Sequence, residues 1–126
     1  MKMPSPLLVI VVVSAGGCGA GDDRPDGESP GVTSTLRISA EAGGALRFVE
    51  RELSATAGTV AITMDNPSAV PHAVAIKGNG RDEQGETVGK DGVSTVAVEL
   101  EPGTYSFYCP VGSHEAAGMR GTLVVR

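Results

Sequence analysis

The chain has 126 residues, which is enough for one domain with its own hydrophobic core. Its 15 acidic and 10 basic residues give a net charge of −5 at pH 7, which argues against a nucleic acid as partner. The chain contains only two cysteines and two histidines, so a site built from these residue types has few candidates.

Residues 1–17 have the pattern of a secretory signal peptide. Lys2 precedes an apolar run over residues 7–13, and small residues follow it. A bilayer requires about 20 apolar residues, so a permanent transmembrane helix is the weaker interpretation. The small residues end at Cys18 and resemble a bacterial lipobox, in which this Cys is acylated and becomes the mature N-terminus. Ordinary cleavage nearby is the alternative, because Ala15 stands where Leu is usual.

Residues 18–31 are expected to form a lipidated N-terminus and a flexible linker, because the segment is rich in Gly, Pro and acidic residues. A disulfide between Cys18 and Cys109 is not expected. Residues 32–126 would then form an exported domain, either anchored by lipid to the bacterial cell membrane or free in the periplasm.

From residue 32 onward the pattern is all β. Short runs of Val, Ile, Leu and Thr are separated by Gly, Pro, Asn and Asp, without helical periodicity. Alternation places Val60, Ile62 and Met64 on one face, so Met64 is expected in the core and not at a metal. Seven or eight strands of this length predict a two-sheet antiparallel β-sandwich. The expected strands cover residues 33–39, 46–49, 52–55, 59–64, 72–77, 94–100, 103–109 and 121–125.

A long polar insertion covers residues 78–92. Its four carboxylates outnumber its two basic side chains, so it could form an acidic docking patch for a basic redox partner. A solvated loop is the simpler interpretation, and we prefer it.

Three possible metal ligands lie on one loop between two predicted strands, in the spacing Cys109-x4-His114-x4-Met119. A thiolate, an imidazole and a thioether suit copper, which is known in trigonal His2Cys sites with a weak axial Met. Such a site requires a second histidine, and the chain has only His72 left. The residues therefore predict a type 1 copper site formed by His72, Cys109, His114 and Met119.

The segment Gly-Thr-Tyr-Ser-Phe-Tyr-Cys over residues 103–109, followed by His114, Ala-Gly-Met and a closing strand, resembles the cupredoxins and most closely their plastocyanin branch. The resemblance covers roughly residues 45–126. It implies a Greek-key β-sandwich with one copper ion, and a monomeric one-electron carrier, not an enzyme, with transient redox protein partners. Four residues separate Cys109 from His114, as in rusticyanin and auracyanin, whereas plastocyanin has two. The redox potential and the partner therefore do not carry over.

The resemblance also carries expectations about the surroundings of the copper. Tyr108 would face outward beside Cys109 and provide a second electron route, although a half-exposed strand tyrosine is an equally good interpretation. Ala73 stands where plastocyanin has an Asn that braces the Cys loop. A small apolar rim is expected around His114, formed by Val70, Pro71, Pro110, Val111, Ala116 and Ala117.

Two other functions stay open beside the electron carrier. A copper delivery or storage protein on the cell surface would have an exchangeable site or a tail rich in Met and His, and this chain has no such tail. A metal-free sandwich used for adhesion or assembly would be preferred if the four ligands lay far apart. The sequence shows no second ligand cluster, which argues against a multicopper oxidase or a copper nitrite reductase.

Overall fold

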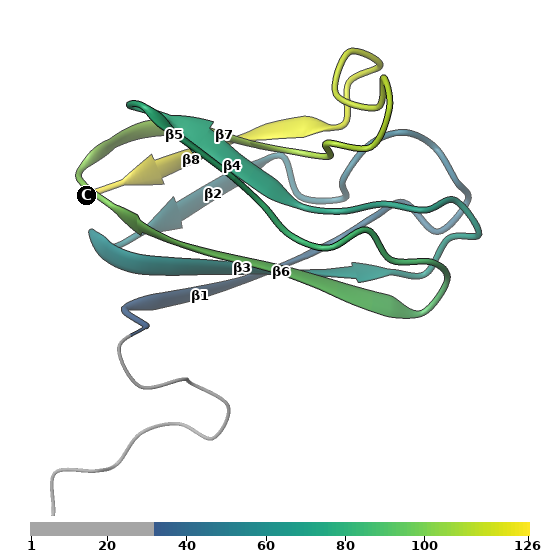
Figure 1. Ribbon diagram of the computed structural model, residues 1–126, viewed down its shortest axis with the longest axis horizontal. Helices are drawn as coiled ribbons and strands as arrows, with labels where there is room; N and C mark the ends of the chain where they lie inside the picture. Colours follow the sequence, from purple (N-terminus) through teal and green to yellow (C-terminus); the bar gives the residue numbers. More distant parts are fainter. Residues whose placement is uncertain (1–31) are drawn as a thin grey trace, which may run out of the picture.

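The computed structural model describes residues 32–126, so the predicted signal peptide, Cys18 and the linker lie outside the described residues. Eight strands form two layers that face each other (Figure 1). They are β1 (Ser34–Ser39), β2 (Glu52–Ala55), β3 (Gly58–Asn66), β4 (Ala75–Gly78), β5 (Arg81–Gln84), β6 (Gly92–Leu100), β7 (Gly103–Tyr108) and β8 (Arg120–Val125). The predicted all-β sandwich is confirmed.

Both sheets are mixed, whereas the sequence predicted antiparallel ones. The three-stranded sheet has the order β1-β3-β6, and the five-stranded sheet has the order β2-β8-β7-β4-β5. β1 runs parallel to β3, and β2 runs parallel to β8. Successive strands β1 and β2 lie in different sheets, so no tight hairpin imposes an antiparallel neighbour on either of them.

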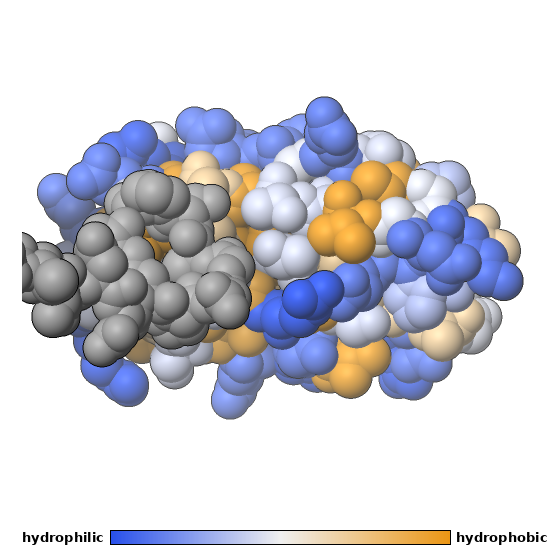
Figure 2. Space-filling model, turned by 90° about the horizontal axis from the view of Figure 1, so that it is seen from below, coloured by the Kyte–Doolittle hydropathy of each residue, from blue (hydrophilic) through white to orange (hydrophobic). Residues whose placement is uncertain are grey.

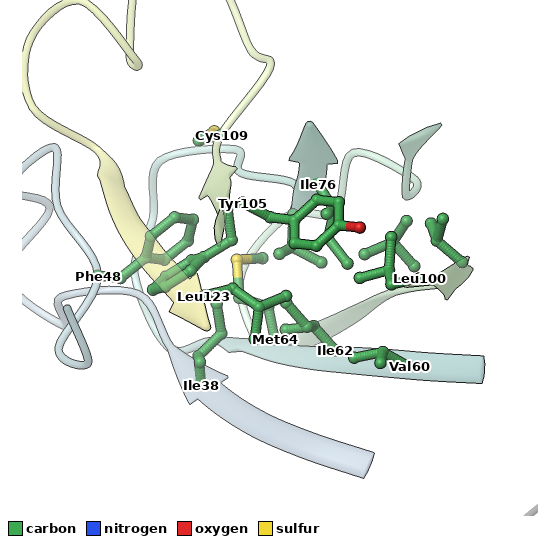
Figure 3. Packing of buried hydrophobic residues seen from close by; sticks show 14 of the residues in the cluster. Ile38, Phe48, Val60, Ile62, Met64, Ile76, Leu100, Tyr105, Cys109 and Leu123 are labelled. Atoms are coloured by element: carbon green, nitrogen blue, oxygen red, sulfur yellow. The ribbon is translucent and has the colours of Figure 1, made fainter. Parts of the chain in front are cut away.

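The core fills the space between the sheets (Figure 3). Alternating residues of β3 and β6 face inward from one layer, and β4, β7 and β8 supply the other. Met64 is fully buried in this cluster, as predicted. Tyr105 and Phe107 also point inward from β7, and Cys109 follows at the edge of the same cluster.

The predicted strand over residues 46–49 does not form. Phe48 makes only an isolated bridge to Ala40, although its ring is buried and lies 5.5 Å from that of Phe107. The side chain of Glu50 accepts a hydrogen bond from the Ser39 N–H at 2.8 Å. In a longer ladder the Ser39 N–H would donate to a backbone carbonyl, but here the Glu50 carboxylate accepts it. Phe48 therefore packs into the core although the segment around it is not a strand.

Part of the segment 78–92, which we expected to be a solvated loop, is a strand instead. β5 pairs with β4 as a hairpin, and its four residues are all exposed. The turn has positive φ at Asn79 (46°) and Gly80 (78°), the conformation that Asn-Gly favours in two-residue hairpins. The Asn-Gly turn therefore forms a hairpin although the strand that follows it is polar and exposed.

The strand now assigned to β4 begins later than predicted, at Ala75 instead of residue 72. The Val74 N–H donates to the Ser94 hydroxyl at 3.3 Å and so stays outside the strand ladder.

Seen from below, polar residues cover most of the visible surface, and apolar residues form separate small patches (Figure 2). Within residues 32–126 we find no helix of the length and apolarity that crossing a bilayer requires.

Candidate metal centre

The predicted ligands lie at one end of the sandwich, where the connections after β3 and β7 come together (Figure 1). Ala75, Gln84, Tyr108 and Arg120 form the last paired row of the five-stranded sheet at this end. Residues 66–74 and 109–119 extend beyond that row. Strands therefore hold both ends of the loop that carries Cys109, His114 and Met119.

The buried side chain of Asn66 fixes the segment that carries His72. Its Nδ2 donates to the carbonyls of Val70 at 2.9 Å and Val88 at 3.0 Å, while its Oδ1 accepts from the Ser68 hydroxyl and N–H. The backbone of His72 is paired with that of Val88 in both directions. This role of Asn66 was not predicted, although the Asn-Pro-Ser sequence before His72 is typical of a turn.

The loop from Cys109 to Met119 is closed by its own backbone hydrogen bonds. The Cys109 N–H donates to the Met119 carbonyl, and the Met119 N–H donates to the His114 carbonyl, both at 3.0 Å. The His114 N–H donates in turn to the Val111 carbonyl at 3.0 Å. Each of the three predicted ligands on this loop is thus tied to another by the backbone, so their spacing is fixed before a metal binds.

Three ligand atoms form a compact triangle. The Nδ1 atoms of His72 and His114 lie 3.3 Å apart, and the Cys109 Sγ lies 3.9 Å and 3.5 Å from them, respectively. A point equidistant from all three atoms lies about 2.1 Å from each, close to the bond lengths that nitrogen and sulfur ligands make with a transition metal. The triangle therefore fits one metal ion at its centre.

The ligands differ in exposure. His72, Cys109 and Met119 are fully buried, whereas His114 is half-buried. Burial, and then the charge of His114, lowers the pKa of His72, which favours the neutral imidazole that binds metals. Among residues 32–126 the His72 Nε2 has no hydrogen-bond partner, so packing and the backbone bonds to Val88 orient this ring.

Tyr108 faces away from the core, as expected, but only 5% of it is exposed, so it is not a half-exposed strand tyrosine. Its hydroxyl donates to the Asp82 carboxylate, and the Gln84 amide donates to the same hydroxyl at 3.4 Å. The Lys77 ammonium lies 4.4 Å from the centre of the ring. Burial, and then the bond to Asp82, raises the pKa of Tyr108. The tyrosine faces away from the core but is covered by β4 and β5.

The Lys77 ammonium also pairs with the carboxylate of Glu115, which directly follows His114. One side chain on β4 thus contacts Tyr108 before Cys109 and Glu115 after His114. Ala73 is buried, and its methyl group offers no side-chain hydrogen bond to this loop. The Lys77–Glu115 ion pair connects the loop to β4.

The apolar side chains expected around His114 are all at least partly exposed. Pro71, Ala116 and Ala117 are exposed, and Val70, Pro110 and Val111 are half-buried. They belong to the same two segments that carry the ligands.

A thiolate and two imidazole nitrogens, together with the thioether of Met119 on the same loop, are the donor set that copper prefers.

The comparisons with known proteins agree with this geometry. The sequence model of the copper binding proteins of the plastocyanin/azurin family matches residues 34–126. A plastocyanin of Dryopteris crassirhizoma is 39% identical over 67 residues, which cover 52% of this chain and 63% of that protein. The chain thus spans less than two thirds of the length of this relative.

Solved structures of auracyanins share the fold. The auracyanin of Roseiflexus castenholzii superimposes with a TM-score of 0.64 and 24% identity, over 76% of this chain and 99% of that one. Auracyanin A of Chloroflexus aurantiacus, described as a "blue" copper protein, gives a TM-score of 0.60 and 23% identity, over 73% and 98%. At this identity the likeness establishes the fold alone.

Proposed function

Because the chain belongs to the plastocyanin/azurin family of copper-binding proteins, we propose that it carries single electrons between redox proteins. Copper is the cofactor, and His72, Cys109, His114 and Met119 form a type 1 site. When bound, copper alternates between Cu(I) and Cu(II) and so takes up or releases one electron. The protein's part is to hold the ligands, exclude water and receive the partner.

The triangle of His72 Nδ1, His114 Nδ1 and Cys109 Sγ is the observation that supports the proposal most strongly. These atoms are already at the spacing that a metal requires, on segments fixed by Asn66 and by the loop's backbone bonds. Ligands that are held in advance move little when an electron arrives or leaves. A small rearrangement is what fast electron transfer requires.

Met119 would provide the weak axial donor. Its side chain is fully buried, and its backbone is bonded to both Cys109 and His114. A thioether above a trigonal His2Cys set tunes the potential, because it stabilises Cu(II) more than Cu(I). The burial also keeps water away from that side of the site.

Electrons would enter and leave at His114, since it is the one half-buried ligand of the four. The partly exposed Val70, Pro71 and Val111 would supply an apolar contact surface of the kind that transient partners use. Three fully buried ligands also favour retention of copper. A delivery protein needs a site from which copper exchanges readily.

Redox cycling together with metal retention tests the proposal. The copper-loaded protein should give a reversible one-electron wave in voltammetry and keep its copper through repeated cycles in the presence of a chelator. Loss of copper to the chelator within a few cycles would indicate a delivery protein instead.

For the location we propose export and attachment to the outer face of a bacterial membrane through acylated Cys18. The support is the sequence pattern of residues 1–31, which lie outside the described residues. One acyl chain binds a membrane only marginally, so stable attachment needs the further chains of a lipoprotein. Mass spectrometry of the mature N-terminus tests this, and an unmodified N-terminus other than Cys18 would refute it.

A further inference from the structure

A groove of about 740 Å³ lies on the outer face of the five-stranded sheet. Ser106 on β7 and Thr122 on β8 belong to its lining, and these short side chains leave the hollow open between longer neighbours. Ser106 is paired with both Lys77 and Thr122 in the strand register, so one row of residues crosses the groove from β4 to β8. None of the apolar residues expected around His114 belongs to the lining of this groove.

The groove is lined by three cations, of which Lys77 is paired with Glu115, whereas Arg51 and Arg120 face no carboxylate of the lining. In the part of the chain that the structure describes, the side chains of Arg51 and Arg120 form no ion pair. By contrast, Arg37 pairs with Asp65 and Arg47 pairs with Glu41. Two guanidinium groups without a carboxylate partner therefore share one concave surface, in a chain whose net charge is −5.

This groove lies beside the copper ligands. Gly118 lines it and directly precedes Met119. Arg120 is the register partner of Tyr108, which directly precedes Cys109. The Lys77 ammonium, 4.4 Å from the Tyr108 ring centre, forms another part of the lining. A partner seated in the groove would therefore contact residues that adjoin two of the four ligands.

We propose that this groove binds a carboxylate-bearing surface of an acidic redox partner. The inference rests on the proposed electron-carrier function and names the chemistry of the partner. Guanidinium groups pair with carboxylates through two parallel hydrogen bonds, and the Ser and Thr hydroxyls can donate to the same groups. A concave surface admits side chains that project from a protein, whereas the headgroups of a flat bilayer reach only its rim.

The charge of β5 sets the orientation of such a partner. Asp82 and Glu83 are exposed on this strand, and Asp82 is the register partner of Lys77. Carboxylates of the partner would be attracted to β7 and β8 and repelled from β5. Asp82 and Glu83 would thus exclude the wrong orientation, a role that differs from the acidic docking patch considered as an alternative for residues 78–92.

Binding of a hexaglutamate peptide to the full chain loaded with Cu(I) tests the proposal. In 15N NMR titrations at low salt, the largest amide shifts should occur at Lys77, Ser106, Arg120 and Thr122. The double variant Arg51→Gln/Arg120→Gln should bind the peptide about three- to tenfold more weakly. The control Lys90→Gln removes an exposed cation that lies outside both the groove and β5 and should leave the affinity unchanged.

The proposal is overturned if the shifts fall outside the groove, if the Arg51→Gln/Arg120→Gln variant binds as well as the parent, or if Lys90→Gln weakens binding equally. Vesicles of phosphatidylglycerol serve as a competing probe, and tighter binding to them with the same arginine dependence would assign the groove to a membrane. Voltammetry of the same samples in the presence of a chelator measures reversible electron transfer and copper retention, so a failure of the carrier function is detected separately.

Discussion

His72 and His114 are 42 positions apart in the chain, yet their Nδ1 atoms lie only 3.3 Å from each other. The two rings meet edge to face, at an interplanar angle of 66°. At most one of these nitrogens can donate a hydrogen bond to the other, and the Cys109 sulfur faces both. A cation at the centre satisfies all three atoms at once, which is why this end of the sandwich is best understood as a metal site.

Replacing Met119 with Leu should keep the blue colour and raise the redox potential. The substitution removes the weak axial donor but leaves the His72, Cys109 and His114 triangle unchanged. A tenfold weaker stabilisation of Cu(II) relative to Cu(I) corresponds to a rise of about 59 mV. Voltammetry of both proteins measures this, and an unchanged or lower potential would show that Met119 is not the axial ligand.

Glu115→Gln should loosen the loop that carries His114, because it removes the ion pair with Lys77. Both side chains are partly exposed, so the effect is modest, and copper loss to a chelator should become faster by up to about fivefold. Glu86→Gln, which changes an exposed carboxylate on the segment after β5, is the matched control. Equal rates for both variants would mean that the ion pair does not hold the loop.

Val111→Lys should slow electron self-exchange by roughly tenfold, because two copies would then meet with like charges at the rim. Val111 is half-buried and lies on the ligand loop without being a ligand, so the visible spectrum should stay nearly the same. Self-exchange can be followed by NMR line broadening in mixtures of Cu(I) and Cu(II) protein. An unaffected rate would place the electron exit away from this rim.

Phe48→Ala should lower the free energy of unfolding by about 3–5 kcal/mol, since it removes a buried ring and leaves a cavity. The ring packs against Phe107 on β7, two residues before Cys109, so the copper site should also lose copper more easily. Val49→Ala, at a residue that is 60% exposed, is the control and should change the stability by no more than about 0.5 kcal/mol. Denaturant unfolding measures both variants.

Most of the ligand set could be predicted from one short segment of the sequence. Cys109, His114 and Met119 lie within eleven residues of each other, and His72 is the only remaining histidine. Alternation along β3 likewise identified its buried face, including Met64. The three ligands of the loop and the buried faces follow from the order of residues within one segment, whereas His72 was assigned because the chain has no other histidine to offer.

The features that the sequence did not reveal depend on contacts between distant segments. Tyr108 is buried because Lys77 and Asp82 cover it from other strands. The segment around Phe48 is not a strand, because the Glu50 carboxylate takes the Ser39 N–H. The β5 hairpin had a local signal in Asn79-Gly80, but the polar composition of the strand concealed it.

The visible absorption spectrum of the copper-loaded protein tests the central claim most directly. A Cu(II) ion bound by the Cys109 thiolate together with His72 and His114 should give an intense thiolate-to-copper band and a blue protein, and the Cys109→Ser variant should lack this band. A copper-loaded parent protein without an intense band, or a Cys109→Ser variant that stays blue, would contradict a type 1 copper site at this end of the sandwich.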